Sequence, residues 1–91
     1  MTHLMKVLEN QTYGPKDICN RVGISNRQLE YWVLIGVVEP LSEPHGVKVF
    51  RRFTQEDLEI LLQVKKLTDE GVLVSRAAEK VKKERKKEEP L

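Results

Sequence analysis

The chain has 91 residues, of which 40% are hydrophobic and 33% are charged, and its formal net charge is +2. This length predicts a single domain, and the apolar content predicts a folded globule rather than a disordered chain. A net charge this small permits nucleic-acid binding but does not argue for it, because an electrostatic footprint depends on where the charges lie.

Several classes of protein are disfavoured at once. Cys19 is the single cysteine, and His3 and His45 lie far apart, so neither a disulfide framework nor a cysteine-based metal site is expected. The chain has no Gly-rich phosphate loop and no catalytic grouping at a motif spacing, so we expect no enzyme. It also has no secretory signal and no apolar run long enough to span a membrane, so we expect a reducing, cytoplasmic setting.

The first clear element follows an N-terminal segment, residues 1–12, which fits either a short helix or an extended arm. Gly14 and Pro15 then open a helix over Lys16–Val22, because proline is preorganised for the first helical position. Gly23 is the expected helix stop.

A second short helix is predicted over Asn26–Ile35, with Ser25 as its N-cap and Gly36 as its stop. Two short helices joined across residues 23–25 are typical of a helix-turn-helix.

The second helix has two different faces. At 100° per residue, Leu29, Trp32 and Val33 cluster on one side, which we assign to the core. Arg27, Tyr31 and Leu34 lie on the other side. Glu30 is expected to pair with Arg27 at i, i+3, although its carboxylate could instead accept a hydrogen bond from a cytosine amino group.

Between Val37 and Phe53 the spacing of apolar residues changes from the pattern of helices to that of β-structure. Val37-Val38 and Val47–Phe53 favour strands, and residues 39–46 are rich in turn formers. We therefore predict a two-stranded hairpin with its loop at Ser42–Gly46.

Two further helices follow the hairpin. Thr54 and Asp57 approximate a capping box for a helix over Gln55–Glu70, which Gly71 ends. Ser75 is the expected N-cap of a last helix from Arg76 to about Glu88. The segment KKERKKEE, residues 82–89, has no apolar position, so it predicts a solvated face and no coiled-coil seam.

This order of elements resembles the MerR family of transcription regulators. DICNRVGISNRQLEYWVLIGVVEP, residues 17–40, resembles the family's helix-turn-helix, and VFRRFTQEDLEIL, residues 49–61, resembles its wing-to-helix junction. RQLEYW, residues 27–32, is closest to a subgroup with an acidic residue and Trp, where other members carry Arg and Tyr.

The resemblance implies a mostly α winged helix-turn-helix of four to five helices and a two-stranded wing. The domain would cover residues 13–81, with an N-terminal arm or short helix before it and a charged helix end or tail, residues 82–91, after it. The family's dimerisation helix and effector domain have no expected counterpart here. We therefore predict no cofactor, metal or small-molecule effector, and self-association that is weak or depends on DNA.

The implied function is sequence-specific binding of double-stranded DNA in transcription regulation, by a cytoplasmic, nucleoid-associated protein. Helix 26–35 would enter the major groove, and wing 37–53 would contact the backbone or the minor groove. By resemblance, Arg51 matches the family's wing arginine, Phe53 replaces a usual Tyr, and Glu30 and Leu34 replace residues that are often basic. The predicted DNA contacts are Lys16, Ser25, Asn26, Arg27, Gln28, Glu30, Tyr31, His45, Lys48, Arg51 and Arg52.

Two other functions remain open at this point. The same fold serves excisionase-like proteins, which bend DNA for recombination. It could also act as a protein-interaction adaptor that presents Leu34 and the neighbouring aromatic residues to a partner.

Overall fold

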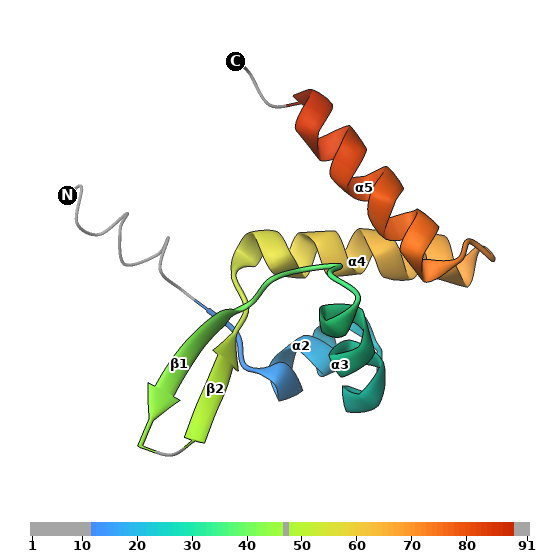
Figure 1. The fold of residues 1–91 in the computed structure, drawn as a ribbon. Helices are drawn as coiled ribbons and strands as arrows, with labels where there is room; N and C mark the ends of the chain where they lie inside the picture. The colour runs from blue at the N-terminus through green and yellow to red at the C-terminus, as the bar shows by residue number, and fades with distance from the viewer. Residues whose placement is uncertain (1–11, 47, 89–91) are drawn as a thin grey trace.

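The computed structural model describes residues 12–46 and 48–88 and, within them, four helices and one two-stranded antiparallel sheet (Figure 1). The elements are α2 (Pro15–Val22), α3 (Asn26–Leu34), β1 (Leu41–His45), β2 (Lys48–Arg52), α4 (Gln55–Asp69) and α5 (Val74–Glu88). The predicted mostly helical fold with a hairpin wing is confirmed. The prediction of an arm or short helix before Thr12 lies outside the described residues.

The turn between α2 and α3 forms as the sequence predicts. Gly23 has a left-handed φ of 82°, and its backbone N–H donates to the carbonyl of Cys19 at 2.8 Å. The Ser25 hydroxyl then accepts from the backbone N–H of Gln28 at 3.0 Å, which satisfies one free donor of the first turn of α3. Helix α3 ends at Leu34, one residue before the predicted end, because Ile35 takes the C-cap position.

The hairpin differs from the prediction in where its first strand begins. Val37 and Val38 are buried core residues that precede the sheet, and β1 runs through the segment predicted as a loop. Leu41 pairs with Arg52 and His45 pairs with Lys48, so the strands pair up to His45 and the turn begins after it. The predicted loop at Ser42–Gly46 is therefore wrong. In a sheet of two strands each strand is an edge, where a proline such as Pro44 is tolerated.

Helix α4 begins with the predicted capping box. The Thr54 hydroxyl accepts from the backbone N–H of Asp57 at 3.1 Å, and the Asp57 carboxylate accepts from the backbone N–H of Thr54 at 3.0 Å. Helix α5 begins one residue before Ser75, because the carbonyl of Leu73 already accepts from the N–H of Ala77 at 2.8 Å. The prediction that Ser75 caps this helix is therefore wrong.

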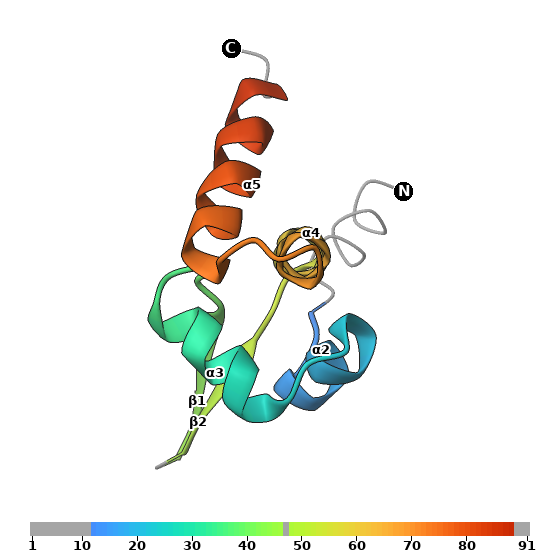
Figure 2. The ribbon, with the colours of Figure 1, turned by 90° about the vertical axis from the view of Figure 1, so that its right-hand side faces the viewer.

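The hydrophobic core lies where α2, α3, α4 and the first half of α5 meet. Its buried members come from every helix and from both ends of the hairpin segment: Ile18, Val22, Ile24, Leu29, Trp32, Val37, Val38, Phe53, Leu58, Leu61, Val64, Ala77, Ala78 and Val81. Two views at right angles agree that α5 projects from one side of α4, whereas α2 lies on the other side (Figures 1 and 2). The α2–α3 pair and the C-terminal end of α5 are thus separated in space.

The first testable prediction concerns the two aromatic residues that are neighbours on α3. Trp32 is 2% exposed and Tyr31 is 51% exposed. We expect Trp32→Ala to lower the free energy of unfolding by about 3–5 kcal/mol, because it leaves a cavity in the core. Tyr31→Ala should change it by no more than about 0.5 kcal/mol. Urea unfolding followed by far-UV circular dichroism measures both; equal losses would contradict the assigned faces.

Candidate nucleic-acid interface

The exposed face of α3 is the one that the helical wheel predicts. Leu29 and Trp32 are buried, while Arg27 and Tyr31 are exposed and Leu34 is 82% exposed. The helix therefore attaches to the core by one side and offers a positive, a phenolic and an apolar side chain on the other. A helix anchored in this way can enter a groove of a nucleic acid without leaving the core.

Glu30 has a different partner from the one we expected. Its carboxylate accepts a hydrogen bond from the Asn26 amide at 3.4 Å, one helical turn earlier. Arg27 and Glu30 are both described, and no ion pair joins them, so the predicted i, i+3 pair is not formed. The Arg27 guanidinium is left facing solvent, where it can bind an anion.

A shallow groove of about 390 Å³ separates α3 from the hairpin. Asn26 and Glu30 line it from α3, and Ser42 and Arg51 line it from the two strands, where they are paired across the sheet. Phe53 also lines the groove and is fully buried. Asn26 and Glu30, which are predicted site residues of α3, therefore share one surface with Arg51, a predicted site residue more than twenty positions further along the sequence.

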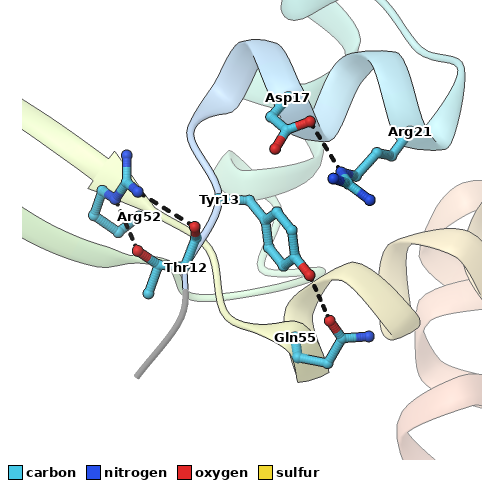
Figure 3. A network of polar contacts seen from close by, with 6 residues as sticks. All are labelled: Thr12, Tyr13, Asp17, Arg21, Arg52 and Gln55. Carbon is cyan, nitrogen blue, oxygen red and sulfur yellow. Dashed lines mark hydrogen bonds and ion pairs between the residues drawn. The ribbon is translucent and has the colours of Figure 1, made fainter. Parts of the chain in front are cut away.

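The two adjacent arginines of β2 have different surroundings. Arg51 is exposed at the groove, whereas Arg52 is half-buried on the other face of the strand. The Arg52 Nε donates to the Thr12 hydroxyl at 2.9 Å, and its Nη2 donates to the Thr12 carbonyl at 3.3 Å (Figure 3). Arg52 thus ties the wing to the segment that precedes α2.

Tyr13 makes a second connection between that segment and the rest of the domain. Its backbone forms both hydrogen bonds of an antiparallel bridge with Phe53, each 2.8 Å long. Its hydroxyl donates to the Gln55 side chain at 2.7 Å, and Arg21, which is paired with Asp17, lies 4.9 Å from the ring centroid (Figure 3). The geometry of this ring and guanidinium fits a cation–π contact.

The roles of Thr12 and Tyr13 could not be predicted from the sequence. Their partners are about forty residues away, so no local spacing could reveal them; the one available signal was an aromatic residue directly before Gly14 and Pro15. Most of the predicted contact residues are exposed, namely Lys16, Ser25, Asn26, Arg27, Gln28, Glu30, Tyr31 and Arg51. The side chains of His45 and Lys48 lie outside the described part of the chain.

Cys19 has the environment of a structural thiol. It is partly buried against the core, and burial raises its pKa above the usual value. The thiol therefore stays protonated at neutral pH, which makes it a poor nucleophile. Within residues 12–46 and 48–88, no three His, Cys, Asp or Glu side chains come together as a metal site. No helix in that part of the chain is both long and apolar enough to cross a membrane.

Comparison with known proteins gives concordant results. The model of the family described as "MerR HTH family regulatory protein" matches residues 13–84. The HTH-type transcriptional repressor CarH of Myxococcus xanthus is 46% identical over 72 residues, which are 78% of this chain and 23% of CarH. The chain therefore spans less than a quarter of the length of this relative.

A solved structure has the same fold. A MerR-family transcriptional regulator from Bacillus cereus superposes with a TM-score of 0.68 at 18% identity, over 78% of this chain and 52% of that protein. At this identity the likeness concerns the fold alone. Because the family model matches most of the chain, this protein belongs to the MerR family of helix-turn-helix regulatory proteins, a family of DNA-binding transcription regulators.

Proposed function

We propose that this domain binds double-stranded DNA sequence-specifically and regulates transcription, with α3 in the major groove and the hairpin on the adjacent backbone or minor groove. The observation that carries the proposal is the single surface shared by the exposed face of α3 and Arg51 of the wing. A major groove about 12 Å wide admits an α-helix, and a wing beside it would meet the flanking phosphates.

Each residue of this surface has a proposed task. Arg27 binds a phosphate or a guanine edge, and the Tyr31 hydroxyl donates to a phosphate. Arg51 binds a phosphate from the wing. Glu30, which the Asn26 amide orients, would repel a phosphate and is suited to accept from a cytosine amino group. The recognition helix thus combines one positioning cation with one carboxylate that favours particular bases.

Arg52 has a different proposed task from the one its sequence position suggests. Two of its nitrogens already donate to Thr12, and the side chain is half-buried. We therefore treat Arg52 as a positioning residue, which holds the wing at the right angle to α3 and leaves the phosphate contact to Arg51.

The resemblance to CarH, which is a transcriptional repressor, supports a regulatory role. Because the chain spans 23% of CarH, repression itself remains part of the proposal.

Selection of bound sequences from a random duplex pool tests the function directly. Recovery of a shared motif is the expected result, and recovery of unrelated sequences would contradict it. An excisionase-like protein would instead bend its DNA site on binding. The gel mobility of complexes with DNA fragments that carry the site at different positions detects such a bend.

A second candidate function rests on the apolar part of the same face. Leu34 is 82% exposed and Tyr31 is 51% exposed, which is suited to a protein partner. If the face serves a protein instead of DNA, Leu34→Ala should abolish capture of that partner. Under our proposal Leu34→Ala leaves the salt dependence of DNA binding unchanged, because leucine neutralises no phosphate.

Salt dependence provides a test of the proposed phosphate contacts. Each contact contributes about 0.9 to the slope of log affinity against log salt concentration. Arg27→Gln and Arg51→Gln should each weaken DNA binding and reduce that slope by about one. Lys66→Gln removes the same charge from an exposed position on α4 and should leave the slope unchanged. Fluorescence anisotropy at several salt concentrations measures this; an unaltered slope for Arg51→Gln would refute the docking of the wing.

The same measurement separates the two tasks of the neighbouring arginines. Arg52→Gln should lower affinity without changing the salt slope, because it misplaces the wing but removes no phosphate contact. Thr12→Val, which removes the accepting hydroxyl, should have a smaller effect of the same kind. The double variant should be no weaker than Arg52→Gln alone, since both changes break one interaction. A slope reduced by about one in Arg52→Gln would instead establish a direct phosphate contact.

A further inference from the structure

The positive charge of this chain is concentrated on its last helix. Val74–Glu88 contains seven basic and three acidic residues, a net charge of +4, so the rest of the chain has a net charge of −2. The recognition helix α3 has one basic and one acidic residue and is neutral. The helix with the strongest positive charge is therefore not the helix proposed to enter the major groove.

The cations of α5 divide between two faces. Arg85 faces the domain, where its Nη2 lies 3.5 Å from a Glu56 oxygen and 3.6 Å from a Glu59 oxygen of α4. Lys82 donates to the carbonyl of Gly36, near the end of α3. These two residues have partners within the fold, and they help to fix the direction in which α5 leaves the domain.

The outward face of α5 forms what we call the basic stripe, which consists of Arg76, Lys80, Lys83 and Lys86. At 100° per residue these four lie within an arc of about 120°, opposite the buried Ala77, Ala78 and Val81. All four are exposed, and none has an ion-pair partner among the residues that the structure describes. They line a shallow concavity of about 850 Å³ together with Val72, Lys82 and Glu79, which is the one carboxylate there.

The composition of this face indicates the chemistry of its partner. From Ser75 to Lys86 the described surface of α5 exposes no large hydrophobic residue. Protein interfaces depend on apolar and aromatic anchors at their centre, whereas the phosphate backbone of a nucleic acid can be bound by cations without an apolar anchor. The stripe spans about 15 Å of helix, a length over which duplex DNA carries about nine negative charges.

We propose that the basic stripe is a second, sequence-independent binding surface for the phosphate backbone of duplex DNA. Figures 1 and 2 show that α5 projects away from α3 and from the hairpin, so one straight duplex on the recognition face would not run along α5. The stripe therefore holds a second duplex, or a distant segment of the same DNA. The domain would in this way bring two DNA segments together.

The first experiment isolates the stripe from the recognition face. In the full chain, Arg27→Gln combined with Arg51→Gln disables the proposed recognition contacts. We expect this variant to bind a labelled random-sequence duplex at low salt with a slope of about 3 to 4 in log affinity against log salt. Adding Arg76→Gln, Lys80→Gln, Lys83→Gln and Lys86→Gln should abolish that binding. Glutamine keeps helix propensity, and far-UV circular dichroism verifies that α5 is retained.

A matched pair on the same helix provides the control. Arg76→Gln and Arg85→Gln each remove one guanidinium charge, from opposite faces of α5. Only Arg76→Gln should reduce the salt slope, by about 0.9. Equal reductions would mean that total charge matters and the stripe does not, and would overturn the inference.

The second experiment tests bridging. An immobilised duplex is loaded with protein and then exposed to a second, fluorescent duplex. The wild-type chain should retain the second duplex, and the variant with four glutamines in the stripe should not. Equal retention by both proteins would overturn the proposal. Binding of a single duplex, as in the first experiment, distinguishes the two surfaces: if Arg27→Gln and Arg51→Gln leave that binding unchanged while the stripe variant loses it, the recognition site is refuted and the stripe is supported.

Discussion

Phe53 is the residue on which the arrangement of the other elements depends. Its side chain is fully buried, its backbone is paired on both sides with Tyr13, and the next residue, Thr54, caps α4. One buried ring therefore fixes the end of the wing, the entry to α2 and the start of α4 relative to one another. It also lines the groove between α3 and the hairpin, so the distance between the recognition helix and the wing is set from within the core.

The connection to the segment before α2 supports the same geometry from the other side of the wing. Arg52 binds Thr12 through two nitrogens, while Tyr13 contacts both Gln55 and Arg21. A two-stranded hairpin is marginally stable by itself and needs packing against the rest of a fold. Here that support comes from Thr12 and Tyr13, which precede α2 and contact the end of the wing.

The distribution of charge distinguishes the two surfaces that we propose to bind DNA. Helix α3 is neutral and has a carboxylate at its groove, which favours selection among bases over general attraction to phosphate. Helix α5 has a net charge of +4, which exceeds that of the whole chain, and it projects away from α3 (Figure 2). The proposed recognition and the proposed general attraction to DNA therefore lie on separate helices, and each can be altered without the other.

The sequence by itself determined the helices, the N-caps of α3 and α4, the stop of α2 and which face of α3 is buried. Ser25, Thr54, Gly23 and the spacing of Leu29 and Trp32 act within one or two helical turns. Its local signals misplaced the start of β1 and of α5. Val37 and Val38 favour strands yet fill the core, and the carbonyl of Leu73 opens the last helix ahead of Ser75. Only the tertiary structure decided that Arg52 turns to Thr12 and that Asn26 and Arg51 share a groove. Those choices depend on partners brought close by the packing around Phe53, and no spacing along the chain encodes them.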